Sequence, residues 1–185
     1  MKTVEPIRDK KKLAAMKKVL KAQSLRDWLL FTLGINSGLR ISDLLQLKVS
    51  NVYRQNRIRI LEVKTGKEKD FPLSETCVKA VKEYLAETNL PVASTLFPSR
   101  KGGQVISRVQ AYRIINAAAR TVGITDSIGT HTMRKTFGYH AYQTGIDISR
   151  IQKLLNHSAP SVSLTYPYQS WRTVRFNRAE RTSGN

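Results

Sequence analysis

The residues best suited to chemistry gather between Thr130 and Tyr166, where histidines, an arginine and a tyrosine follow one another. Gly129 and Thr130 are typical of a helix start, with Thr130 as the N-cap. His131 and Arg134 then lie one turn apart and share a face near the helix N-terminus. Free amides, the positive end of the helix dipole, a guanidinium and an imidazole all favour an anion there. The pattern predicts a site of phosphate size.

Two further candidates follow. Gly145 is expected to end the helix of His131, and Asp147 to cap a second helix that leads to His157. A short segment after Pro160 leads to Tyr166, a possible nucleophile once its phenol is deprotonated. By itself, a histidine just past a helix end is more often a partner of the helix dipole than a catalyst.

A metal site is the alternative use of the three histidines, His131, His140 and His157. No His-x-His or HExxH spacing supports it, and the single Cys77 can build neither a disulfide nor a cysteine-based zinc site. We expect neither a metal nor a cofactor.

Composition indicates the class of partner. The 185 residues suit one domain, which would bury about 70% of the surface of its unfolded chain. Thirty-two Lys and Arg residues against 13 acidic ones give a net charge of +19, which indicates a polyanion, with nucleic acid first and an anionic membrane surface second. The most apolar run, Trp28 to Ile35, is too short to span a bilayer, and no signal peptide is evident. We expect a cytoplasmic protein without membrane contact.

Residues 1–22 form a basic N-terminal segment that is expected to be helical from Arg8 to Ala22. Leu13, Met16 and Leu20 are the apolar stripe of this helix. Its lysines form either a solvated face or an arm that contacts phosphates, and the sequence leaves both open.

The next helices place another arginine. Ser24 caps an apolar helix that Gly38 ends, and Ser42 is expected to start a helix over Asp43 to Leu47. Arg40 therefore lies in a tight corner, either aimed at a ligand or capping the preceding helix. Asp43 either orients Arg40 through a bidentate pair or serves as a first-turn acid.

Between Val52 and Leu73 the apolar residues alternate, which predicts a β-hairpin or a three-stranded sheet. Lys64 lies beside the turn, where lysines are usually only solubilising; Lys67 and Lys69 are the alternatives if one of them is functional. Ser74 and Ser107 are expected to cap further helices, the second with Val109, Tyr112, Ile115 and Ala119 facing inward. The fold class is α+β, mainly α-helical with a small antiparallel sheet.

Five segments together resemble the tyrosine recombinases, the phage integrase family. His131-x-x-Arg134, Leu154 to Ser158 and Leu164 to Tyr166 resemble the C-terminal signature of the family. Asn36 to Leu45 resembles its first-arginine box, and Lys64 to Lys67 its lysine-bearing hairpin. The resemblance covers nearly the whole chain.

The resemblance implies the tyrosine recombinase catalytic-domain fold over residues 1–170, followed by a basic tail, 171–185. It also implies cleavage and rejoining of double-stranded DNA through a 3′-phosphotyrosine, without metal or ATP, by a homo-tetramer on paired sites. The implied site residues are Arg40, Lys64, His131, Arg134, His157 and Tyr166.

One feature departs from the family pattern: Pro167 follows Tyr166 and disfavours helical backbone there. Tyr168 is therefore a rival nucleophile. Two other functions stay open, a catalytically impaired DNA-binding module of the same fold and a nicking-closing enzyme like type IB topoisomerases. The sequence also leaves open whether the chain is a fragment of a longer integrase or a short, stand-alone member.

Overall fold

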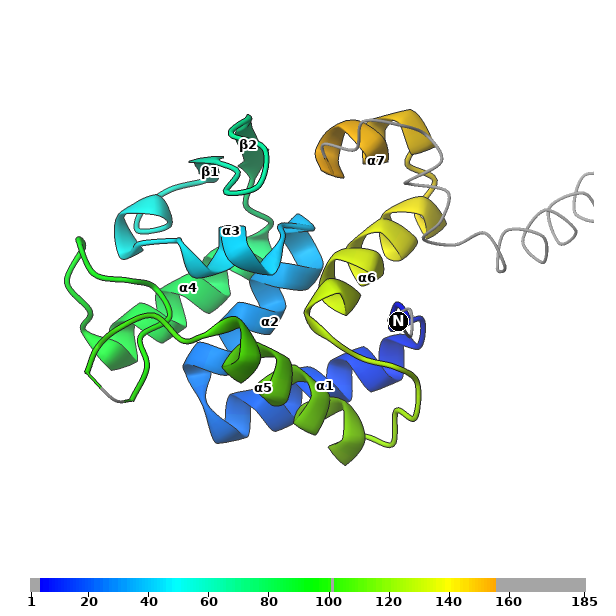
Figure 1. Ribbon diagram of the computed structural model, residues 1–185, viewed down its shortest axis with the longest axis horizontal. Coiled ribbons are helices and arrows are strands. Elements are labelled where there is room, and N and C mark those ends of the chain that lie inside the picture. The colour runs from blue at the N-terminus through cyan, green and yellow to red at the C-terminus, as the bar shows by residue number, and fades with distance from the viewer. Residues whose placement is uncertain (1–3, 101, 156–185) are drawn as a thin grey trace, which may run out of the picture. The chain divides into compact units, whose positions relative to one another are not determined.

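The computed structural model describes residues 4–100 and 102–155, in two compact units that divide between Phe137 and Gly138. The first unit holds, in order, α1 (Lys10–Gln23), α2 (Leu25–Ser37), α3 (Ile41–Leu45), the 3-10 helix η1 (Val49–Asn51), β1 (Arg57–Leu61), β2 (Glu68–Pro72), α4 (Glu75–Thr88) and α5 (Arg108–Thr121). Helix α6 (Thr130–Gln143) runs from the first unit into the second, which continues with α7 (Ile148–Leu155) (Figure 1).

Helix α2 is the centre of the first unit and packs against α1, α3, α4 and α5. Its bounds are those predicted, because both ends carry local signals: the Ser24 hydroxyl accepts the Asp27 N–H, and Gly38 adopts a left-handed φ of 62°. The helix is buried on several sides through Leu29, Leu30, Phe31 and Leu33. It therefore gives its C-terminal end, where Arg40 follows, a fixed position.

Helix α1 begins two residues later than predicted, after Asp9, whose carboxylate caps it, and buries the expected Leu13, Met16 and Leu20. Some of its lysines have structural partners. The Lys12 ammonium donates to the Gly123 carbonyl at 2.9 Å, and Lys21 pairs with Glu83 at 2.7 Å. A phosphate contact by the remaining lysines stays a prediction.

Strands β1 and β2 form a two-stranded antiparallel hairpin rather than a three-stranded sheet. In its register, Ile58 lies opposite Phe71 and Ile60 opposite Lys69. In the turn, the Gly66 N–H donates to the Glu62 carbonyl at 2.8 Å, with Gly66 at a left-handed φ of 64°. The hairpin stands at the end of this unit away from α1 (Figure 1).

Helix α5 corrects one prediction. Ser107 caps it as expected, but Val109 and Tyr112 are 57% and 47% exposed rather than inward. The buried face carries mainly small residues, Ala111, Ile115, Ala118 and Ala119. Ile115 and Ala119 are buried as predicted, whereas periodicity misplaced Val109 and Tyr112 because apolar residues lie on both sides of this helix.

Helix α6 approaches α2 closely, because Gly34 of α2 faces the Met133 side chain, which would overlap any Cβ at that position. The helix includes Thr130, one residue earlier than predicted, and the Thr132 hydroxyl accepts the Gly129 N–H at 3.1 Å. Within the second unit, the Asp147 carboxylate accepts the Ser149 N–H at 2.8 Å and caps α7 as expected.

No helix in the described ranges is long and apolar enough to cross a membrane. His157, Tyr166, Tyr168 and the boundary predicted at residue 170 lie outside the described residues.

Candidate nucleic-acid cleavage site

Arg40 occupies the corner between α2 and α3 at the N-cap of α3, which spans Ile41–Leu45 rather than the predicted Asp43 to Leu47. Its side chain is 16% exposed, and its Nη1 lies 2.7 Å from Glu62 Oε2. The predicted bidentate pair with Asp43 is wrong, since the single contact there is 4.0 Å. Asp43 instead accepts the Val63 N–H at 2.9 Å, so this carboxylate joins α3 to the hairpin.

Arg134 lies in the second turn of α6 and is only 2% exposed. Its Nη1 donates to the Gly38 carbonyl at 2.7 Å, which crosses 96 residues of sequence. The arginine that binds the end of α2 is therefore Arg134, whereas the guanidinium of Arg40 turns to Glu62. The two arginines are brought together because Gly38 stands two residues before Arg40.

Glu62 and Lys69 complete this group of charges, and both are buried. The Lys69 Nζ lies 3.9 Å from Glu62 Oε1, while the Thr65 hydroxyl donates to Glu62 Oε2 at 2.7 Å. Burial is the main cause that lowers the pKa of Lys69 to about 8; Arg134 and Arg40 act in the same direction, and Glu62 and Asp43 act against them.

Sequence reasoning missed Glu62 and named Lys69 only as an alternative to Lys64. The signal was nevertheless present, because Glu62 continues the alternation of Ile58 and Ile60, and Lys69 shares the face of Phe71. Both charged side chains therefore had to point inward. No local rule, however, says which partners a buried charge will meet.

Lys64 is exposed in the turn between β1 and β2. The residues on either side of it are held: the Val63 N–H by Asp43, and the Thr65 hydroxyl by Glu62. The same two carboxylates that face Arg40 therefore anchor the backbone that presents Lys64.

His131 is exposed on the first turn of α6. Partial desolvation of its ring lowers its pKa, and Arg134 lowers it further, followed by Arg108, Lys135 and Arg40. The lowered pKa favours the neutral imidazole, which is the form that can accept a proton.

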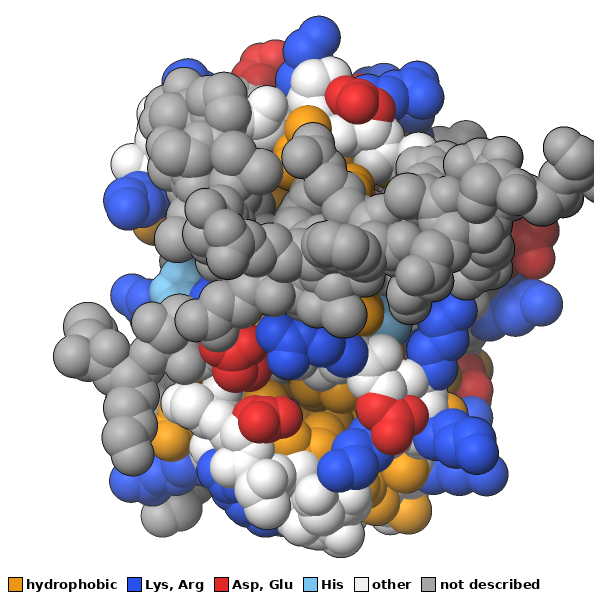
Figure 2. All heavy atoms as spheres, turned by 90° about the vertical axis from the view of Figure 1, so that its right-hand side faces the viewer, with side chains coloured by type: hydrophobic (Ala, Val, Ile, Leu, Met, Phe, Trp, Pro, Cys, Tyr) orange, Lys and Arg blue, Asp and Glu red, His pale blue; other side chains and the backbone are white. Residues whose placement is uncertain are grey.

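The group combines three cations with two carboxylates, and its members are buried except for the partly exposed Arg40. The three cations are Arg40, Arg134 and Lys69, and both arginines also lower the pKa of His131. Such a set of donors suits an anion with several oxygens. Lysine and arginine side chains also recur around the outline of the face in Figure 2. Among the described residues, no three His, Cys, Asp or Glu side chains are placed to hold a metal ion.

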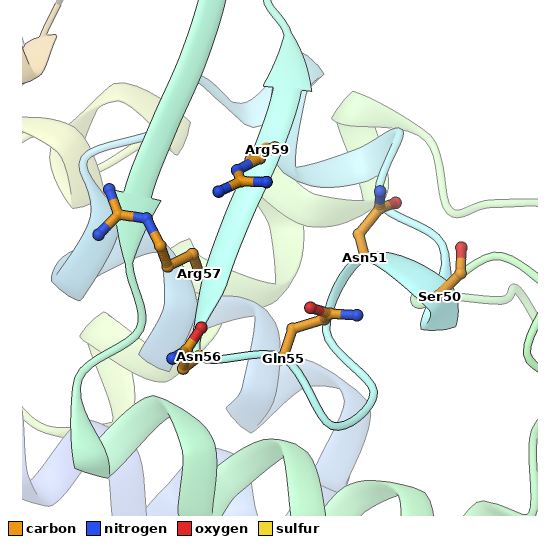
Figure 3. Close-up of a pocket in the computed structure, with 6 residues that line it drawn as sticks. All are labelled: Ser50, Asn51, Gln55, Asn56, Arg57 and Arg59. Atoms are coloured by element: carbon orange, nitrogen blue, oxygen red, sulfur yellow. The ribbon is translucent and has the colours of Figure 1, made fainter.

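Apart from this group of charges, a polar pocket lies on the outer side of the hairpin (Figure 3). It is lined by Ser50, Asn51, Gln55, Asn56, Arg57 and Arg59. Asp70 accepts from the Nε of both arginines, at 2.8 Å for Arg57 and 3.4 Å for Arg59. The pocket contains none of the predicted site residues, and its arginines share one acid in an exposed setting.

Comparison with known proteins identifies the family to which the chain belongs. The model of the phage integrase family matches residues 8–170. Probable integrase/recombinase YoeC of Bacillus subtilis (strain 168) is 42% identical over 166 residues, which cover 90% of this chain and 90% of YoeC. Tyrosine recombinase XerC of Thermodesulfovibrio yellowstonii is 31% identical over 150 residues, which cover 77% of this chain but only 50% of XerC. The chain thus spans about half the length of that relative.

Solved structures agree on the fold. The XerA recombinase matches with a TM-score of 0.81 at 21% identity, over 99% of this chain and 68% of XerA. The XerH site-specific recombinase in its post-cleavage complex with palindromic difH substrate matches with a TM-score of 0.76 at 22% identity, over 96% of this chain and 53% of XerH. The predicted fold class, mainly helical with a small antiparallel sheet, is confirmed. By the family match and the identity to YoeC, the chain belongs to the phage integrase family, the tyrosine recombinases.

Proposed function

We propose that this tyrosine recombinase cleaves and rejoins double-stranded DNA at specific sites through a 3′-phosphotyrosine, without metal or ATP. The observation that carries the proposal is the convergence of Arg40, His131 and Arg134. They come from segments about 90 residues apart, yet both arginines act on the pKa of His131. The Arg134 hydrogen bond to the Gly38 carbonyl, two residues before Arg40, also supports one phosphate site for the three groups.

In the proposed cleavage step, the Tyr166 oxygen forms a bond to phosphorus while the bond from phosphorus to the 5′-oxygen breaks. His131, with its lowered pKa, takes the phenol proton. Lys64, exposed on the turn, gives a proton to the leaving 5′-oxygen. Rejoining reverses these proton transfers with a 5′-hydroxyl as the nucleophile.

Arg40 and Arg134 would bind the non-bridging oxygens and stabilise the charge of the transition state, with His157 donating to the same oxygens. The charge of +19 supports a DNA partner. The solved XerH and lambda integrase complexes hold DNA, and lambda integrase forms a tetramer on a Holliday junction. For this chain, a tetramer on paired sites and a cytoplasmic location belong to the proposal.

Covalent trapping tests this function. Wild type, Tyr166→Phe and Tyr168→Phe would be incubated with a pool of nicked duplexes tiling the DNA beside the gene that encodes the chain. We expect a protein–DNA adduct on a denaturing gel from wild type and Tyr168→Phe, and none from Tyr166→Phe. Loss only in Tyr168→Phe would move the nucleophile by two residues. Binding without any adduct would favour the impaired DNA-binding module.

A paired-site assay separates recombination from nicking and closing. With two labelled duplexes that carry the cleaved site, a recombinase yields exchanged strands from a synaptic complex. Relaxation of supercoiled DNA without exchange would favour the topoisomerase-like alternative.

A further inference from the structure

We propose that Lys69 is a positioning residue for strand cleavage: with Glu62 it forms a buried ion bridge that fixes the Arg40 guanidinium and the turn that carries Lys64. The proposal rests on the proposed function. It assigns a role to a lysine of the hairpin that is distinct from proton donation by Lys64.

Lys69 takes a place on the hairpin that an apolar side chain would ordinarily fill. It lies opposite Ile60, on the inward face that it shares with Phe71, and is 6% exposed. The charged groups that face it come from three directions: Glu62 at the end of β1, Arg40 and Asp43 at α3, and Arg134 on α6. Within the described ranges, its ammonium makes no direct hydrogen bond. Packing alone does not explain a lysine there.

The buried carboxylates nearby explain why a lysine occupies this position. The carboxylates of Glu62 and Asp43 are both fully buried, and a buried carboxylate requires compensating positive charge. Arg40 lies 2.7 Å from one oxygen of Glu62, and Lys69 lies 3.9 Å from the other. Glu62 is therefore held between two cations. Without Lys69, Glu62 would have less positive charge beside it, and its attraction for the Arg40 guanidinium, already 2.7 Å away, would compete more strongly with a phosphate.

Glu62 also transmits its position to the Lys64 turn. The same oxygen that meets Arg40, Oε2, accepts the Thr65 hydroxyl at 2.7 Å. A shift of Glu62 would thus displace the phosphate-binding arginine and the backbone beside Lys64 together. Lys69 is buried on the inward face of β2, whereas Lys64 is exposed in the turn, so we infer that Lys69 acts through Glu62.

A double-mutant cycle tests the bridge. Single-turnover adduct formation would be measured for wild type, Lys69→Met, Glu62→Gln and the double variant on the nicked duplex that traps wild type. We expect Lys69→Met to cleave about tenfold to a hundredfold more slowly with DNA binding unchanged, because small displacements of catalytic groups cost this much. In the Glu62→Gln background the same change should cost much less. Equal costs in both backgrounds would overturn the bridge. Glu68→Gln, exposed and adjacent to Lys69, is the matched control.

The pH profile separates charge from packing. The ratio of wild-type to Lys69→Met rates should be large below about pH 7 and fall toward one as pH rises through about 8, where Lys69 loses its proton. Groups whose pKa does not depend on Lys69 cancel in the ratio. A ratio that stays constant with pH would show that only the packing of the side chain matters. Should Lys69→Met fail to fold, Lys69→Gln gives the same ratio.

A substrate with sulfur in place of the leaving 5′-oxygen separates positioning from proton donation, since a thiolate leaves without a proton. We expect this substrate to restore cleavage by Lys64→Met but not by Lys69→Met. Restoration of Lys69→Met would make Lys69 the general acid and overturn the proposal. An adduct missing from wild type itself would overturn the proposed function. The coupling between Lys69 and Glu62 would then still be measurable, by urea unfolding of the same four proteins.

Discussion

The two faces of the β1–β2 hairpin carry the same kinds of charged residues in different settings. On the outer face, Arg57 and Arg59 pair with Asp70, and their side chains are 43%, 78% and 43% exposed. On the inner face, Lys69 and Glu62 are 5% and 0% exposed and meet Arg40. Exposed ion pairs contribute little because water competes for each partner, whereas breaking a buried pair leaves an uncompensated charge. Position relative to solvent, rather than residue type, decides which pairs govern the site.

The largest expected effect is on stability when the buried group loses a cation. Arg40→Met should lower the free energy of unfolding by about 3–5 kcal/mol, because Glu62 and Asp43 then stay buried with less positive charge. Urea unfolding followed by circular dichroism measures it. Arg57→Met makes the same chemical change on the outer face and serves as the control. Equal losses in the two variants would remove the distinction between the faces.

An intermediate effect is expected from the titration of Lys69. Its folded pKa of about 8 lies below the ordinary lysine value of 10.5, so the unfolded chain binds more protons between these values. Stability from this group is therefore gained as pH rises through that window. The unfolding free energy of wild type relative to Lys69→Met should rise by about 3 kcal/mol from pH 8 to 10.5. The raised pKa of Tyr84 cancels in this difference. A flat difference would mean that Lys69 keeps its ordinary pKa.

The smallest effect is expected from Asp70→Asn. The Arg57 hydrogen bond lowers the pKa of Asp70, yet the residue is exposed, and we expect the unfolding midpoint and the cleavage rate to match wild type at physiological salt. Thermal unfolding and adduct formation check this. A large loss of cleavage would mean that the outer pocket of Figure 3 belongs to the active site.

The same contrast explains what could be predicted from sequence. The bounds of α2 follow from Ser24 and Gly38, because caps are decided by a few neighbouring residues. Arg40 and Arg134 could be named as candidates from their motifs, but the Gly38 carbonyl that joins their surroundings is distant in sequence from Arg134.

Where prediction failed, tertiary contacts decided. A bidentate pair of Asp43 with Arg40 was one of two alternatives, whereas Asp43 lies in the first turn of α3 and Glu62 provides the close contact to Arg40 from the hairpin. Tyr112 was expected inside by periodicity, whereas the alanines of α5 form its buried face. Local patterns predict which face a side chain takes more readily than which partner it finds. The roles of His157 and Tyr166 stay predictions.

The most direct test of the account is whether Arg40 and Arg134 bind the scissile phosphate as planar bidentate donors. Single-turnover cleavage and DNA binding would be measured for Arg40→Lys and Arg134→Lys, with Arg57→Lys from the outer face as the control. We predict cleavage slower by about a hundredfold or more for the first two, with binding nearly unchanged, because an ammonium keeps the charge but not the fork of donors. Near-normal cleavage by either variant would contradict the account.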